Sequence, residues 1–127
     1  MSETILKLHE ICGENTYTRD DAVPLYNKIR DGLLAGNNVT VDFEEKEISS
    51  ESFLDEAIVE HYIHPKVPNA AKKITLKNVL GFDKSLMARI YNYRKEIEDK
   101  QLKKAQKATN ATHSIIRDSN QDSSAKK

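Results

Sequence analysis

Three short runs of apolar and β-branched residues alternate along the chain with longer stretches in which apolar residues recur at helical spacing. The runs cover residues 4–11, 37–43 and 73–79, and a helical pattern follows each of them. Strands that are joined by helices in this way make right-handed crossovers and pair in parallel. The sequence therefore predicts an α/β fold with a small, mainly parallel or mixed sheet and alternating helices. Because so few strands make a thin sheet, the pattern leaves open a further strand near the N-terminus or between the helices.

The first two helices have predictable ends. Thr18 and Asp21 match a helix-start pattern. We nevertheless place the start at about Asp20, because Pro24 then lies early in the helix, where no backbone N–H is needed. The second helix is predicted over residues 51–63. The buried stripe of the first helix is expected to consist of Val23, Tyr26, Ile29, Leu33 and Leu34.

The C-terminal part is predicted to be a long helix followed by a polar tail. Asp83 is expected to cap this helix, whose apolar stripe ends near Lys95. After Ala108 the composition is typical of disordered segments. The predicted organisation is one domain over residues 1–107, which includes the extended last helix, and a disordered tail over residues 108–127.

A formal net charge of zero conceals a strong asymmetry. Residues 1–66 carry 14 acidic and 6 basic residues, whereas residues 67–127 carry 6 acidic and 14 basic residues. The basic helix that begins near Lys95 is compatible with low-affinity binding to nucleic acid, although Glu96 and Asp99 interrupt its positive stripe. A nucleic-acid-associated accessory protein that uses this helix and the tail is therefore our alternative function.

The distribution of apolar residues and the single cysteine favour a cytoplasmic protein. The longest apolar runs are too short for a transmembrane helix, and residues 1–10 carry acids where a signal peptide needs a basic start. Cys12 has no partner for an internal disulfide, as is usual in a reducing compartment, and we expect it to be buried at the end of the first strand. We expect no membrane partner and no cofactor. The oligomeric state stays open.

Hydroxyl and carboxyl side chains gather between the second strand and the second helix. We call residues 44–56 the acidic turn; it contains Ser49, Ser50 and Ser52 among acidic residues. Either Ser50 or Ser52 can accept a hydrogen bond from an early helical N–H. A helix N-terminus can also hold a phosphate, although the neighbouring acids would repel an added charge of about −2. Helix capping alone and a phosphate switch at Ser50 are both open hypotheses.

The spacing of the histidines argues against catalysis and against a metal site. A serine nucleophile needs an adjacent base, and His61 and His64 lie too far along the same helix. These histidines could hold a transition metal together with Glu60, but no further ligand recurs at a matching spacing. We therefore predict that the chain is not an enzyme and has neither catalytic residues nor a metal site.

The helix starts and the second strand together resemble the STAS-like family of unknown function. This family is a divergent relative of the STAS domains of sulphate transporters and anti-sigma-factor antagonists. The similarity covers roughly residues 13–94 and agrees with the order of strands and helices that the apolar pattern predicts. The residues that carry it are Arg19 and Ala22 at the helix start, Asp42 and Phe43 at the strand end, and Phe53 and Glu56 closing the serine-bearing turn.

The resemblance implies a binding module. In the antagonist branch, a partner kinase of the GHKL-type ATPase class phosphorylates a serine at the start of the helix after this strand, and the phosphate releases the antagonist from that partner. Phe53 aligns with the conserved leucine of that branch's motif, which makes Ser50 the candidate phosphoacceptor. The implied partner is an ATPase or kinase-like regulator in a prokaryotic cytoplasm.

The predicted function is a non-enzymatic protein–protein interaction module that binds its partner through the acidic turn. The start of the preceding helix is expected to complete this surface, since in a parallel sheet both helix starts lie at the same edge. The predicted partner-binding residues are Arg19, Asp42, Glu45, Ser49, Ser52 and Glu56.

Overall fold

The computed structural model of the protein describes residues 2–120, and the side chains of residues 2–102. The chain divides into two compact units, Met1–Asn92 and Tyr93–Lys127. The described part of the second unit is a continuation of helix α6. The elements in chain order are β1 (Glu3–Lys7), α1 (Leu8–Cys12), α2 (Arg19–Leu34), β2 (Asn38–Asp42), α3 (Glu51–Leu54), the π-helical segment η1 (Asp55–Val59), α4 (Glu60–Ile63), α5 (Ala70–Lys73), β3 (Ile74–Lys77) and α6 (Gly81–Asn120).

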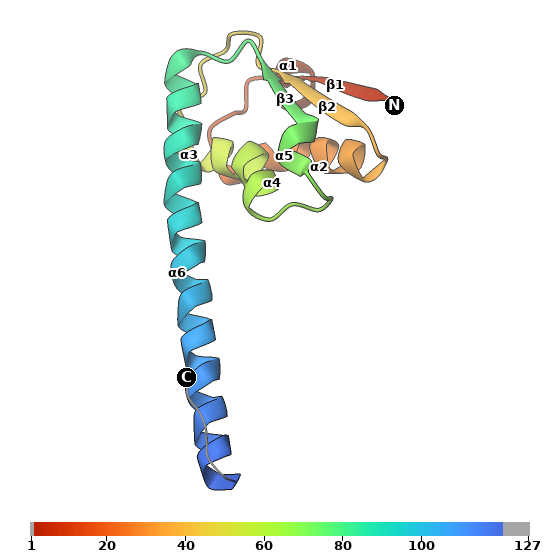
Figure 1. Ribbon diagram of the computed structural model, residues 1–127. Helices are drawn as coiled ribbons and strands as arrows, with labels where there is room; N and C mark the ends of the chain where they lie inside the picture. Colours follow the sequence, from red (N-terminus) through yellow and green to blue (C-terminus); the bar gives the residue numbers. More distant parts are fainter. Residues whose placement is uncertain (1, 121–127) are drawn as a thin grey trace. The chain divides into compact units, whose positions relative to one another are not determined.

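The sheet is parallel throughout, with the strands in the order β1-β2-β3. Because the strand order follows the chain, right-handed crossovers place α2 and the helix formed by α3, η1 and α4 on the same face of the sheet (Figure 1). The predicted α/β fold with a parallel sheet and alternating helices is thus confirmed. Between residues 2 and 120 the structure has no fourth strand.

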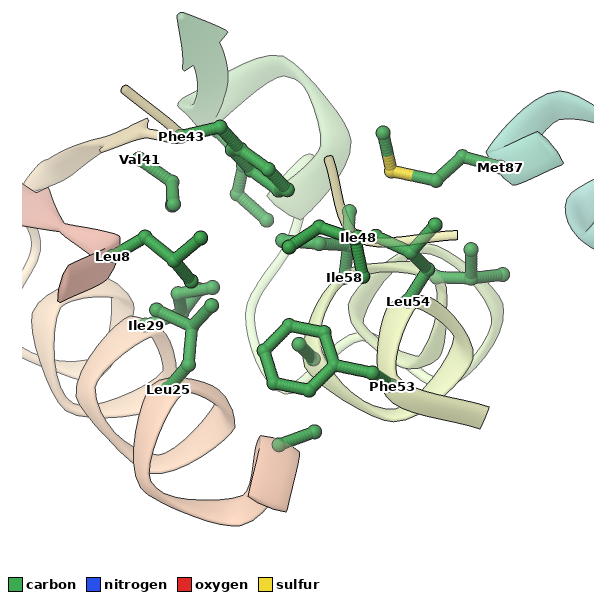
Figure 2. Close-up of a cluster of buried hydrophobic side chains, with 14 of the residues drawn as sticks. Leu8, Leu25, Ile29, Val41, Phe43, Ile48, Phe53, Leu54, Ile58 and Met87 are labelled. Carbon is green, nitrogen blue, oxygen red and sulfur yellow. The ribbon is translucent and has the colours of Figure 1, made fainter. Parts of the chain in front are cut away.

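The hydrophobic core lies between the sheet and these helices. Val41 extends from β2 toward Ile29 of α2, whereas Phe43, directly after β2, extends toward Ile48 (Figure 2). All of these side chains are buried. Met87, from the part of α6 that belongs to the first unit, approaches the same cluster and is also buried. The core therefore joins α6 to the layer of helices that covers the sheet.

The first strand is shorter than predicted. It ends at Lys7, and residues 8–12 form helix α1 instead of continuing the strand expected over residues 4–11. A helix turns Leu8, Ile11 and Cys12 toward the core together, whereas a strand would point Ile11 to the opposite face. Cys12 is buried as expected, and its burial raises the pKa of the thiol to about 11, so that it stays protonated and unreactive.

Helix α2 is capped by Thr18 and not by Asp20. The Thr18 hydroxyl accepts a hydrogen bond from the Asp21 N–H at 3.1 Å, and the Asp21 carboxylate accepts one from the Thr18 N–H at 3.0 Å. This reciprocal pair is a capping box. Pro24 consequently lies deeper in the helix than predicted, and the structure tolerates it on the exposed side.

The buried face of α2 differs from the predicted stripe. Val23 and Leu34 face solvent, whereas Ile29 and Leu33 are buried as expected. Gly32 also lies on the buried face. This position requires glycine because a Cβ here would come within 2.8 Å of Val39 Cγ2. The close approach of α2 to β2 thus selects a small residue that a search for large apolar side chains passes over. The buried face consists of Ala22, Leu25, Ile29, Gly32 and Leu33.

The helix predicted over residues 51–63 is confirmed, and it contains an insertion that the sequence does not reveal. It continues from α3 through η1 into α4, so its middle turns are π-helical. Such widened turns inside α-helices are often found at functional sites. The widened segment begins at Asp55, within the acidic turn.

Helix α6 begins at Gly81, so Asp83 lies in its first turn and is not its cap. The helix continues past residue 107 to Asn120. The predicted division between a domain over residues 1–107 and a tail over residues 108–127 stays a prediction, and residues 121–127 lie outside the described part of the chain. Within that described part, no helix is both long and apolar enough to cross a membrane.

Candidate functional site

The backbone of the acidic turn has an uncommon conformation. Glu44, Glu45 and Ser49 have positive φ angles of 56°, 60° and 53°. Glu44 and Glu45 are the central residues of a tight turn in which the Lys46 N–H donates to the Phe43 carbonyl at 3.0 Å. Positive φ at both central positions is typical of glycine and asparagine, so two glutamates here bear a steric cost.

Hydrogen bonds from other elements hold this turn in place. One carboxylate oxygen of Asp42 accepts from the Glu44 N–H and from the Asn78 side-chain amide, both at 2.9 Å. The backbone carbonyl of Asn78 accepts from the Glu45 N–H at 2.9 Å. The backbone N–H of His9 donates to the Glu44 carboxylate at 3.0 Å. The bonds from Asn78 and from the Glu44 N–H lower the pKa of Asp42. Asp42 therefore anchors the beginning of the turn as an ionised acceptor.

Replacement of Glu45 by glycine is expected to raise the free energy of unfolding by about 1 kcal/mol. Glycine adopts positive φ without steric cost, and this gain exceeds the added flexibility of the unfolded chain. Urea denaturation of the wild type and the variant measures the difference. Glu45→Ala removes the same side chain but keeps the strained backbone, so its stability is expected to stay within about 0.5 kcal/mol of the wild type. A similar rise in both variants would show that the side chain, and not the backbone, is responsible.

A buried carboxylate, predicted from the sequence to be a helix cap, instead holds the middle of the acidic turn. Asp83 is fully buried in the first turn of α6. Its two oxygens accept hydrogen bonds from the Ile48 N–H at 2.8 Å and from the Ser49 N–H at 2.9 Å. The last helix thereby holds the backbone immediately before Ser50. An acid close after Gly81 was visible in the sequence, but its partners lie more than thirty residues away in the chain.

Ser50 caps the helix that follows the turn, as one of the sequence hypotheses predicted. Its hydroxyl oxygen accepts from the Phe53 N–H at 3.2 Å. The same hydroxyl donates to the Tyr17 carbonyl at 2.6 Å, in the segment that leads into α2. Ser50 therefore links the starts of the two helices. Ser52, the other candidate cap, is exposed in the first turn.

Arg19 forms a second link between the same two helices. Its guanidinium donates to Asp55 at 3.1 Å and to Glu56 at 3.2 Å. The expectation that both helix starts lie at one edge of the sheet is thus confirmed, and Arg19 contacts Glu56 directly. Asp55 completes the bridge, although it was not among the predicted partner-binding residues. We call Arg19, Ser50, Asp55 and Glu56 the helix-start cluster.

The remaining predicted residues lie outside the helix-start cluster. Asp42 belongs to the anchor formed with Asn78, and within residues 2–102 no hydrogen bond or ion pair joins it to Arg19 or Ser50. The Ser49 hydroxyl donates to the Glu47 carboxylate at 2.7 Å, and Glu45 is exposed. The acidic turn is thus one continuous segment with two separately fastened ends.

The two histidines in and directly after α4 lie in different environments. His61 is fully buried, and its ring stacks on Tyr26 with centroids 4.2 Å apart. His64 Nδ1 instead lies 2.8 Å from the Glu60 carboxylate near the end of α4. In the described residues no group of three potential metal ligands is close enough to hold an ion.

The basic helix has acidic neighbours where its side chains are described. Lys100 lies 3.6 Å from Glu96, and Arg89, in the first unit, lies 3.9 Å from Glu51. The basic residues after residue 102 lie outside the part of the chain whose side chains the structure describes. The nucleic-acid alternative therefore stays a prediction.

The fold and the site together define a small parallel α/β domain whose charged residues and serine cap meet where two helices begin. Residues 21–79 match the family described as the STAS-like domain of unknown function (DUF4325), in agreement with the resemblance that the motifs indicated. The match includes Ser50, Asp55 and Glu56, whereas Arg19 and Asp83 lie outside it. Searches of curated proteins and of solved structures each found no match.

Proposed function

We propose that the protein is a non-enzymatic regulatory module that binds a protein partner through the acidic turn and Arg19. The partner would be an ATPase or kinase-like regulator that presents basic groups to this surface, and phosphate on Ser50 would release it. The observation that carries the proposal is the position of the Ser50 hydroxyl. It caps α3 and also binds the segment before α2.

The contacts of Ser50 favour a switch over a nucleophile. Its hydroxyl proton is directed to the Tyr17 carbonyl, which cannot act as a general base. A phosphoserine at this position has no proton on Oγ, so the bond to that carbonyl is lost. The added charge of about −2 would also lie close in sequence to Glu51, Asp55 and Glu56, which repel it. Modification would therefore separate the two helix starts.

A pull-down with the full-length tagged protein from its own host, followed by mass spectrometry, tests this function. The wild type is expected to retain an ATPase or kinase-like protein, and Ser50→Glu is expected to retain at least about ten-fold less of it, because a carboxylate can neither donate to Tyr17 nor avoid repulsion from Asp55. Ser85→Glu adds the same charge at an exposed position of α6, outside the acidic turn, and is the matched control that should keep the partner.

Two outcomes would contradict the proposal. One is equal retention of the partner by the wild type and by Ser50→Glu, with both variants folded by circular dichroism. The other is recovery of nucleic acid alone, lost in a high-salt wash, which would favour the basic helix as the binding element.

A further inference from the structure

A pocket of about 410 Å³ lies on the first unit, away from the helix-start cluster. Its walls come from α4, α5, β3 and the part of α6 before residue 92. The volume falls within the range of sites that bind small molecules. The lining residues are Tyr62, Ala71, Leu76, Lys84, Met87, Ala88 and Tyr91.

The lining is apolar and aromatic with one charge. Tyr62 and Tyr91 form an edge-to-face pair, with ring centroids 6.3 Å apart and planes at 74°, which makes a firm wall. Ala71 and Ala88 supply small side chains, so the space is not filled from α5 or α6. Of the lining residues, only Lys84 is charged, and no carboxylate of residues 2–102 forms an ion pair with it.

We propose that this pocket binds a small organic anion, a carboxylate whose body is a single ring or a short acyl chain. The apolar body would displace water from the surfaces of Leu76, Met87 and the tyrosine pair, and the carboxylate would lie at the Lys84 ammonium. Such sites combine an apolar lining with a few polar groups that fix the orientation of the ligand.

The charge of the lining residues favours a ligand of negative charge. Burial raises the pKa of Tyr62, so its phenol stays neutral and does not repel an anion. A cationic ligand of the same shape would meet Lys84 without any acidic lining residue to offset the repulsion. An uncharged analogue would keep only the apolar contribution. We therefore expect binding in the order carboxylate, alcohol, amine.

Titration of the full-length protein with octanoate, octan-1-ol and octylamine, followed by amide NMR spectra, tests the proposal. Octanoate is expected to cause saturable shifts in residues of the pocket walls, and to bind at least about ten-fold more tightly than octylamine. 4-Phenylbutyrate is expected to act at the same residues. Shifts that do not saturate, or equal binding of octanoate and octylamine, would overturn the proposal.

Two variants localise the binding. Ala88→Met fills the pocket from its exposed wall and is expected to abolish saturable binding, with the thermal midpoint confirming that the variant folds. Lys84→Gln is expected to weaken octanoate about three- to five-fold and to leave octan-1-ol unchanged. Lys28→Gln, which removes an exposed lysine on α2, is the matched control and should bind octanoate like the wild type. Undiminished binding by Ala88→Met would place the ligand elsewhere and overturn the proposal.

Discussion

Replacement of Asp83 by alanine is expected to lower the free energy of unfolding by about 3 to 5 kcal/mol. The carboxylate is fully buried and accepts from two backbone N–H groups, those of Ile48 and Ser49. Alanine leaves both donors without an acceptor, the Ile48 N–H in a buried position and the Ser49 N–H in a partly buried one. A hydrogen bond to a carboxylate contributes about 1.5 to 3 kcal/mol. Urea denaturation monitored by circular dichroism measures the loss.

Graded variants separate the hydrogen bonds of Asp83 from its position in the helix. Asp83→Asn keeps one acceptor oxygen but places an amide donor against the other N–H, so we expect about half of the loss. Lys84→Ala changes the next residue, which is exposed, and is expected to stay within about 0.5 kcal/mol of the wild type. If Asp83→Ala were as stable as Lys84→Ala, the hydrogen bonds of Asp83 would not be what holds the acidic turn in place.

Acidification is expected to destabilise the protein through His61. Both ring nitrogens are buried without a hydrogen-bond partner among the described residues, and burial lowers the pKa of this histidine from 6.5 to about 4. The unfolded chain therefore binds a proton in a pH range in which the folded chain does not. The contribution of His61 to the free energy of unfolding is fully present above pH 6.5 and is lost as the pH falls toward 4. Near pH 5 the free energy of unfolding is expected to be lower by about 2 kcal/mol for this reason.

The difference between the wild type and His61→Phe isolates this effect. Phenylalanine keeps an aromatic ring against Tyr26 but does not titrate. The other histidines, such as His64 beside Glu60, are common to both proteins. The gap in unfolding free energy is expected to shift in favour of His61→Phe between pH 7 and pH 5 by about 2 kcal/mol. A gap that does not change with pH would mean that His61 is solvated or partnered in solution.

Much of the fold follows from local patterns in the sequence. The alternation of Val39, Val41 and Phe43 marks β2, and the helical spacing from Phe53 to Tyr62 marks the second helix. Such patterns work because they are short-range. They failed at residues 8–12, where an apolar run fits a strand and a helix equally well, and tertiary packing of Leu8 and Cys12 decides for the helix.

The site was only partly predictable for a related reason. Ser50 and Arg19 could be identified because they lie at helix starts, whose chemistry is local. The contacts of Asp83 and Asn78 with the acidic turn join segments that are far apart in the chain, and no spacing rule reveals them. The positive φ angles of Glu44 and Glu45 depend on those same contacts, so sequence propensity argues against them.

Asp83 and Lys84 are neighbours on one turn of α6, yet their side chains contact different parts of the domain. Asp83 fastens the acidic turn, and Lys84 lines the pocket. A ligand that binds more tightly when Asp83 is fastened must, by thermodynamic reciprocity, strengthen that fastening by the same factor. A protein that pulled the acidic turn away from α6 would expel such a ligand to the same degree. Occupancy of the pocket and attachment of the acidic turn would then be linked through a single turn of α6.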